Sequence, residues 1–224
     1  FRGEAFVADV RSAFTQSQKN QRQGRRLFAT PPPGGRPGIP EGTPVLIEVL
    51  GEIYGLISGP PGWRKTVLTD VKDLGFKNHP LAPCVVLMYT DGKDVQLCGV
   101  IVIETDDFLM GGIGDKWDKA ISTFRRRYQF GSWHSLMQGA REYGGRTLLQ
   151  LKDFGFHVTM TRYLKMKARE IVLNRGRGKT PQEDATPGEV TGMRGLVGSL
   201  SWSVREGMPW GAGDASLLAG TLPQ

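Results

Sequence analysis

The sequence predicts an α+β fold, in which a mainly antiparallel sheet is backed by helices and followed by a largely helical C-terminal part. Three observations lead to this prediction. Short runs of apolar and β-branched residues, bounded by turn signals, predict strands in the first 160 residues. Amphipathic stretches with helical spacing lie between these strands. Another such stretch, Glu189–Val204, lies near the C-terminus.

The first predicted strand is Ala5–Ala8, an apolar run that ends at Asp9. A short turn or helix is expected over Val10–Ser17, and a loop rich in proline and glycine over Ala29–Thr43. The run Val45–Leu50 is apolar and alternates enough to predict a second strand.

The first long helix is expected between Ser58 and Gly75. Its apolar residues recur with helical spacing at Trp63, Val67, Val71 and Leu74. Ser58 is expected to cap the N-terminus, because serine favours that position and prolines follow it in the first turn. Gly75 is expected to end the helix, because glycine favours the C-terminal position.

Two further strands, Cys84–Tyr89 and Val95–Thr105, are predicted on either side of a turn at Asp91 and Gly92. Asp115–Tyr128 is expected to form an amphipathic helix, because its apolar residues fall on one face. These elements together predict a hairpin and a helix that backs it.

The second half of the chain is expected to begin with two or three short strands in Leu136–Met160. A helix over Thr161–Leu173 and a polar loop over Asn174–Gly188 follow. After the helix Glu189–Val204, the glycine-rich tail beyond Met208 is expected to be only weakly structured.

The composition restricts the possible functions. The 224 residues carry a formal net charge of +7, which favours a polyanionic partner. No apolar run reaches 18 residues and no signal peptide is visible, so we expect an intracellular protein, not a secreted or membrane protein. Cys84 and Cys98 lie in apolar runs, which predicts reduced core thiols. The sequence contains no phosphate-loop motif and no zinc-ligand spacing.

Adjacent carboxylates, Asp106 and Asp107, stand between two apolar runs and predict a hairpin with a charged tip. Such a like-charge pair is unfavourable unless a bound divalent cation relieves the repulsion. With Asp9 at another strand end, the pattern suits a two-metal phosphoryl-transfer site. We expect Asp9 and Asp106 as direct ligands and Asp107 as less engaged, because successive strand side chains point oppositely. An ordinary Asp-Asp turn is the alternative.

Five motifs, taken in order, resemble the copia-type LTR-retrotransposon reverse transcriptase of the Pol polyprotein. They read FVADVRSAF, GEIYGLISGPPGW, DLGF, APCVVLMY and VIVIETDDFLMGG. A later segment, RGLVGSL, is similar to the Val-Gly-Ser-Leu stretch of that family's C-terminal region. Several motifs in the same order are more specific than any one of them.

The resemblance implies a polymerase palm over residues 1–130, primer-holding strands over 131–160 and a helical thumb or connection region over 161–224. The fingers expected before Asp9 and the RNase H domain expected after the last motif are not in this sequence. We therefore expect a fragment with truncated fingers from a longer polyprotein, with little or no activity of its own.

The implied activity is RNA- or DNA-templated DNA synthesis by two-metal nucleotidyl transfer, with Mg²⁺, or Mn²⁺ in its place, as cofactor. The implied catalytic residues are Asp9, Asp106 and Asp107, and Val10 joins them in the metal site. Implied partners are a template–primer, a dNTP and the remainder of Pol, namely fingers, RNase H and integrase. Such a protein resides in the cytoplasm, in virus-like particles or in the nucleus.

The resemblance also assigns residues to the substrates. The nucleotide-binding positions are Arg11, Ser12, Ala13, Phe14, Ser58 and Gly59. Phe14 matches an aromatic ring under the sugar that would clash with a 2′-hydroxyl and select dNTPs. The nucleic-acid-binding positions are Gly55, Trp133, Arg175, Arg177 and Lys179. Core packing is the alternative role for Phe14 and Trp133, and a solvated loop is the alternative for the three cations.

Two departures from the family pattern leave other functions open. Glu104 stands where the family has tyrosine, and on a regular strand it would share a face with Asp106. Ser58 replaces a glutamine that helps to position the nucleotide and is too short to do the same. One alternative is a catalytically decayed remnant that only binds nucleic acid. Another is a two-metal nuclease of the RNase H or integrase type.

Overall fold

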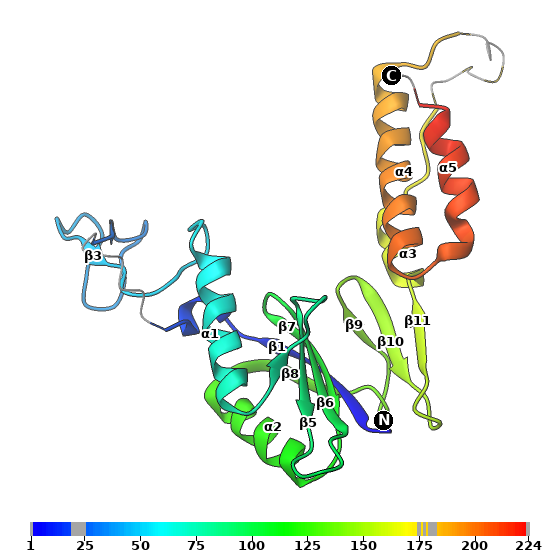
Figure 1. The fold of residues 1–224 in the computed structure, drawn as a ribbon. Helices are drawn as coiled ribbons and strands as arrows, with labels where there is room; N and C mark the ends of the chain where they lie inside the picture. The colour runs from blue at the N-terminus through cyan, green and yellow to red at the C-terminus, as the bar shows by residue number, and fades with distance from the viewer. Residues whose placement is uncertain (1, 19–25, 174–175, 177, 179–182, 223–224) are drawn as a thin grey trace. The chain divides into compact units, whose positions relative to one another are not determined.

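The computed structural model describes residues 2–18, 26–173, 176, 178 and 183–222. The chain divides into two compact units, Phe1–Trp133 and His134–Gln224. Each unit combines strands and helices (Figure 1), which confirms the predicted α+β class. The three-part division into palm, primer-holding strands and thumb stays a prediction.

A six-stranded sheet with the order β4-β5-β6-β7-β1-β8 forms the framework of the first unit. Its strands are β1 Glu4–Val10, β4 Lys77–Asn78, β5 Val85–Tyr89, β6 Leu97–Glu104, β7 Asp107–Gly112 and β8 Phe130–Ser135. The pairs from β4 through β1 are antiparallel. Because the β6–β7 hairpin pairs with β1, the end of the N-terminal strand meets the tip of that hairpin.

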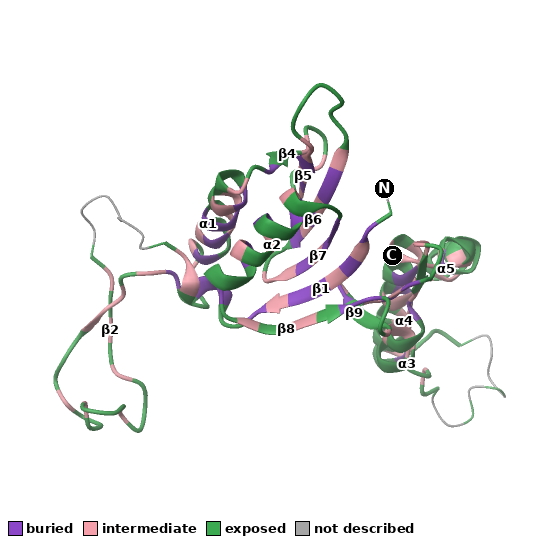
Figure 2. Ribbon diagram, turned by 90° about the horizontal axis from the view of Figure 1, so that it is seen from below, coloured by how far each residue is buried: buried purple, intermediate pink, exposed green. Residues whose placement is uncertain are grey.

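Two helices, α1 (Gly59–Asp73) and α2 (Asp115–Arg127), cover one face of this sheet (Figure 1). Trp63 of α1, Phe124 of α2 and Phe108 of β7 belong to one buried core. Figure 2 shows the buried segments of β1, β6 and β7 in purple. The alternating burial along β1 and β7 follows from strand geometry, which sends successive side chains to opposite faces. Burial of the large apolar side chains on the helix-facing side is the main stabilising contribution.

Two glycines make the slot in which Trp117 packs against the sheet. A Cβ on Gly112 would lie 2.0 Å from Cδ2 of Trp117, and a Cβ on Gly99 would lie 2.3 Å from its Cε3. The register pairs Gly99 directly with Gly112, so the bare backbone of two adjacent strands receives the indole ring. The glycines therefore serve close packing here.

Several predicted elements of the first unit differ in detail. The expected strand Val45–Leu50 is reduced to β3 (Ile47–Glu48), which pairs with β2 (Phe28–Ala29). The expected turn or helix after β1 is a 3-10 helix, η1 (Ala13–Gln16). The apolar pattern did not predict strand β8, because it is only six residues long and carries polar residues; strands in this region were expected only from the resemblance.

The prediction that Ser58 caps α1 with its side chain is wrong. Ser58 occupies the N-cap position but its side chain makes no capping bond. Its Oγ instead donates a hydrogen bond to Oε2 of Glu52 at 2.6 Å. The buried Glu52 carboxylate needs a donor, so it takes the hydroxyl that the helix terminus would otherwise use.

The second unit contains a three-stranded sheet and three α-helices among its described residues. The strands, in the order β11-β10-β9, are Phe156–Thr159, Arg146–Gln150 and Arg141–Tyr143. The helices are α3 Thr161–Lys167, α4 Pro187–Glu206 and α5 Ala212–Gly220. A capping box fixes the start of α4, because Thr186 and Glu189 each satisfy the other's backbone N–H.

The prediction of a weakly structured tail is wrong. After Met208 the chain forms a 3-10 helix, η3 (Pro209–Gly211), and then α5, which packs against α4. Ala215 of α5 is buried, so packing offsets the low helix propensity of the glycines. Within the described ranges, no helix combines the length and apolar character needed to cross a membrane.

Candidate active site

Three carboxylates lie in one row across adjacent strands of the first unit. The strand register pairs Asp9 of β1 with Asp107 of β7, and Asp107 in turn with Glu104 of β6. Residues directly opposite each other in an antiparallel sheet have their Cβ atoms about 4.5–5.5 Å apart on the same face. The topology therefore gathers acidic groups from positions 9, 104 and 107 of the chain.

This row occupies the face of the sheet that α1 and α2 do not cover. The neighbouring residues Ala8, Ile103 and Phe108 belong to the core under the helices. Strand alternation sends Asp9 and Asp107 to the opposite side. The carboxylates are therefore accessible from the open face, on a sheet that the helices hold rigid from behind.

The tip of the β6–β7 hairpin is a two-residue turn that is held at both of its residues. Thr105 has a φ of 57°, in the left-handed region that non-glycine residues rarely adopt. Its carbonyl accepts a 2.6 Å hydrogen bond from Nε1 of Trp63 in α1. The carbonyl of Asp106 accepts a 3.0 Å bond from the N–H of Val10. These two bonds fix the turn to a helix on one side and to β1 on the other.

The geometry corrects two expectations about this hairpin. Thr105 and Asp106 form the turn and Asp107 begins β7 directly opposite Asp9, whereas the sequence predicted Asp106 and Asp107 together at the tip. The lesser engagement of Asp107 with a metal stays a prediction. Glu104 does not share a strand face with Asp106, because the turn breaks the alternation between them; it stands beside Asp107 instead. The predicted strand ran to Thr105 and put the carboxylate pair at the tip, which placed the turn one residue late, because β6 ends at Glu104 and β7 begins at Asp107.

The carboxylates destabilise one another's charged forms. Burial, followed by the charges of Asp106, Asp9 and Glu104, raises the pKa of Asp107 to about 6. Burial and the charge of Asp106 also raise the pKa of Asp9. A cation near the row would oppose both effects, because it favours the ionised forms.

Gly131 of β8 makes room for the Asp9 side chain. A Cβ at this position would lie 2.8 Å from Oδ2 of Asp9. A larger residue would therefore displace the carboxylate from the row. This contact could not be predicted from the sequence, because it depends on β8 lying beside β1.

The donor chemistry suits a hard cation, although the side chains do not converge on one point. Among the described residues, no group of three or more His, Cys, Asp or Glu side chains is arranged to hold a metal ion. Carboxylate oxygens are the ligands that Mg²⁺ prefers, and Mg²⁺ keeps several waters when only one or two carboxylates bind it. Asp9, Asp106 and Asp107 could supply that limited set. The Val10 side chain is buried in the core.

The nucleotide-binding residues assigned by the resemblance follow β1 directly. The N–H of Arg11 donates to the carbonyl of Gln129, and Ser12 has a φ of 50°. Ala13 and Phe14 are buried in η1. The backbone thus turns after β1 and brings Phe14 into the buried core.

Phe14 and Gly59 come together at the start of α1. A Cβ on Gly59 would lie 3.4 Å from Cδ2 of the Phe14 ring. The ring also packs on Tyr54, with centroids 4.6 Å apart. Phe14 is only 9% exposed, so packing is part of its role. Ser58, next to Gly59, donates its hydroxyl hydrogen bond to Glu52.

Gln16 is a positioning residue that sequence reasoning missed. Its Nε2 donates to the carbonyls of Arg11 at 2.5 Å and of Gln129 at 3.2 Å. Its Oε1 accepts a 2.8 Å bond from the N–H of Gln129. The side chain therefore ties the segment after β1 to the residue before β8. A polar residue in a short turn gives no sequence signal for a bond to a partner 113 positions away.

Of the residues expected to contact nucleic acid, Gly55 and Trp133 lie in the part of the chain that the structure describes. Gly55 is exposed with a φ of 92° and has open space where a Cβ would lie. Trp133 packs on Phe130, with centroids 4.9 Å apart, and the Arg125 guanidinium lies 5.0 Å from its ring. The remaining three, Arg175, Arg177 and Lys179, lie outside the described residues.

Comparisons with known proteins give no further assignment. No protein-family model matches the chain, and a search of curated proteins finds no significant match. The structure defines an acidic row across β6, β7 and β1, on the face of the antiparallel sheet that the helices do not cover.

Proposed function

We propose that the chain is the palm and thumb portion of a copia-type reverse transcriptase, which joins a dNTP to a primer 3′-hydroxyl. The observation that carries the proposal is the pairing of Asp9 with Asp107 beside the Asp106 turn. Templated nucleotidyl transfer needs carboxylates from separate strands at one place on an open surface. The first unit brings carboxylates from β1 and β7 together in this way, which supports the proposal.

The cofactor fits the proposal through donor chemistry. Bound Mg²⁺ would activate the attacking hydroxyl and stabilise charge on the phosphates. Asp9, Asp106 and Asp107 would hold it through carboxylate oxygens. The hydrogen bond from Trp63 to the carbonyl of Thr105 holds the backbone of the turn beside Asp106, so the carboxylates would need only side-chain adjustment to meet on a cation.

Phe14 supports a preference for deoxynucleotides. Its ring is held by Tyr54 and by the start of α1, and it follows Asp9 by five residues. A ring fixed on two sides cannot move away from a 2′-hydroxyl without losing its packing. Discrimination by steric exclusion needs this rigidity.

Metal binding and primer extension test the proposal at two levels. Mn²⁺ binding to the chain is measured by electron paramagnetic resonance. Extension on a primed RNA template, with Mg²⁺ and dNTPs, is measured with the chain joined behind the fingers of the family, because the chain alone is expected to have little or no activity. Asp9→Asn and Asp106→Asn should each abolish extension and weaken Mn²⁺ binding by roughly tenfold or more. The matched control is Asp94→Asn, which removes an exposed carboxylate near another hairpin turn. Equal Mn²⁺ binding by all four proteins would refute the proposal.

A non-catalytic remnant that binds nucleic acid is the second candidate. Glu104 adds another negative charge beside Asp107, and Ser58 is held by Glu52. These features favour a site that has lost its polymerase chemistry. Salt-sensitive duplex binding without incorporation would support this candidate. Metal-dependent cleavage of a labelled strand without dNTPs would instead favour a two-metal nuclease.

A further inference from the structure

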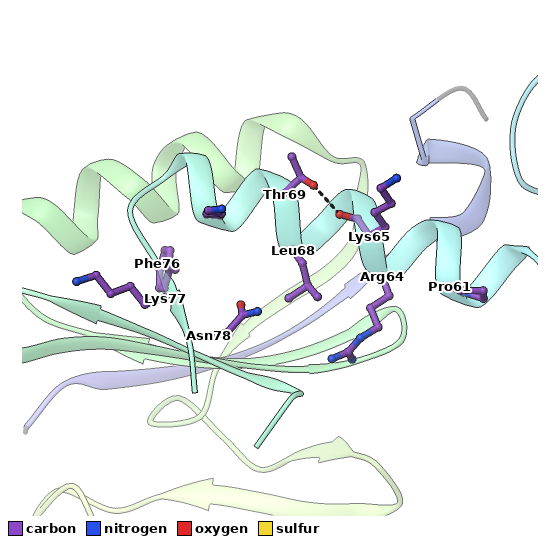
Figure 3. A pocket seen from close by; sticks show the side chains of 9 residues that line it. Pro61, Arg64, Lys65, Leu68, Thr69, Phe76, Lys77 and Asn78 are labelled. Carbon is purple, nitrogen blue, oxygen red and sulfur yellow. Dashed lines mark hydrogen bonds between the residues drawn. The ribbon is translucent and has the colours of Figure 1, made fainter. Parts of the chain in front are cut away.

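A basic groove lies between α1 and the edge strand β4 of the first unit. Its cavity volume is about 630 Å³, within the range of sites that hold small ligands or segments of a chain. Figure 3 shows Arg64 and Leu68 pointing from α1 toward the strands, with Asn78 of β4 near them. None of the proposed catalytic residues lines this groove.

The lining of the groove is strongly cationic. Four of its nine lining residues are basic, namely Arg64, Lys65, Lys72 and Lys77, and none is acidic. The three lysines are exposed. Across the part of the chain that the structure describes, no carboxylate lies within ion-pair distance of them. The groove therefore presents positive charge that the described protein does not neutralise.

The cations are spread over two elements. Lys65 and Lys72 are seven residues apart on α1, which places their backbones about 10 Å apart along the helix axis. Lys77 lies on β4. The Arg64 guanidinium is held in place by hydrogen bonds to the carbonyl of Pro83 and to Sγ of Cys84. This spacing suits successive phosphates of a strand better than one small anion.

The floor of the groove is partly apolar. Leu68 lines it with Asn78, and Phe76, which is only 3% exposed, lies beneath them. Thr69 donates a hydrogen bond to the carbonyl of Lys65 on its own helix (Figure 3). Single-stranded nucleic acid is typically bound by cations that follow the backbone and by an apolar surface that receives the bases. An acidic peptide would match the charges, but its acidic side chains would not pack on the apolar part of the groove as bases do.

We propose that the groove between α1 and β4 binds the phosphate backbone of single-stranded nucleic acid. The site is on the helix side of the sheet, whereas Asp9 and Asp107 lie on the opposite face. It is therefore separate from the acidic row and does not depend on catalysis there. It would hold a single-stranded segment that extends beyond any duplex on the open face.

The test measures binding of a fluorescent 12-nucleotide single strand to the full chain by anisotropy across a salt series. The variant is Lys65→Gln with Lys72→Gln, and the matched control is Lys93→Gln with Lys119→Gln. Both pairs remove two charges from exposed lysines of the first unit. At low salt, the groove variant should bind roughly tenfold more weakly, with a log–log salt slope smaller by about 1.4. The control should match the wild type, and Lys65→Arg with Lys72→Arg should retain affinity.

Lysine acetylation with mass spectrometry locates the strand directly. The oligonucleotide should protect Lys65, Lys72 and Lys77 from acetylation, and it should leave Lys93 and Lys119 reactive. Equal binding and equal salt slopes for the groove and control variants would overturn the proposal. So would equal competition by a glutamate peptide of the same charge, which would indicate a protein partner. Asp106→Asn should leave strand binding unchanged, so failure here is distinguishable from failure of the polymerase proposal.

Discussion

Replacing Asp107 by asparagine should stabilise the first unit at neutral pH. The folded protein holds Asp107 in a partly buried position beside other carboxylates, and these surroundings raise its pKa from 3.8 to about 6. A carboxylate with a raised folded-state pKa binds its proton more tightly when the protein is folded. The free energy of unfolding contributed by this group is therefore fully present below about pH 4 and is lost as the pH rises through 6. Asparagine is neutral at every pH, so it avoids this loss.

The size of the effect follows from the raised pKa. Without solvent screening, the rise in the pKa of Asp107 from 3.8 to about 6 corresponds to about 3 kcal/mol of unfolding free energy. Asp107 is only partly buried, so solvent screening reduces the expected effect to about 1 kcal/mol. We expect Asp107→Asn to exceed the wild type by about this amount at pH 8 and to equal it near pH 4.

Urea unfolding at several pH values measures this difference. The indole N–H resonance of Trp63 is a suitable probe, because that group donates to the hairpin turn beside Asp107. Asp94→Asn serves as the control, since it removes an exposed carboxylate elsewhere in the same unit. Parallel stability profiles for wild type and Asp107→Asn between pH 4 and 8 would refute the reasoning. A variant less stable than wild type at pH 8 would refute it as well.

Three other substitutions test the packing and the proposed site. Gly112→Ala should destabilise the first unit by about 2 kcal/mol, because the new Cβ would overlap the Trp117 ring. Thermal unfolding measures this change, and an unchanged midpoint would contradict the packing. Trp63→Phe should lose about 1 kcal/mol through the missing bond to Thr105, and hydrogen exchange at the β6–β7 turn should accelerate. Phe14→Val should raise ribonucleotide relative to deoxynucleotide incorporation on the order of a hundredfold in primer extension, whereas an unchanged ratio would exclude a sugar-selecting role.

Strong local patterns gave the correct elements in the first unit. The apolar run before Asp9, the helical spacing after Ser58 and the amphipathic stretch of α2 all appear near their predicted positions. Each of these segments buries one face, and the spacing of its apolar residues distinguishes a helix from a strand, so the pattern alone is sufficient to predict the element. The residue pattern missed strand β8 and helix α5, because polar or glycine-rich residues form them and packing against neighbours decides their structure.

The turn at Asp106 shows a different limit. The sequence predicts a hairpin there, but the exact turn residues decide which carboxylate faces β1. A one-residue shift of the turn exchanges the faces of the strand residues. The backbone bonds from Trp63 and Val10 hold the observed turn, and both come from segments distant in the sequence.

By itself, the sequence determined the α+β class, the main strands and helices of the first unit, and the candidate carboxylates at positions 9, 106 and 107. Only the tertiary structure decided that Asp9 lies opposite Asp107, that Ser58 donates a hydrogen bond to Glu52, and that lysines from α1 and β4 line one groove. Periodicity reports which face of a segment is buried. Register, turn position and long-range polar contacts depend on which segments meet, and that is settled only when the whole chain packs.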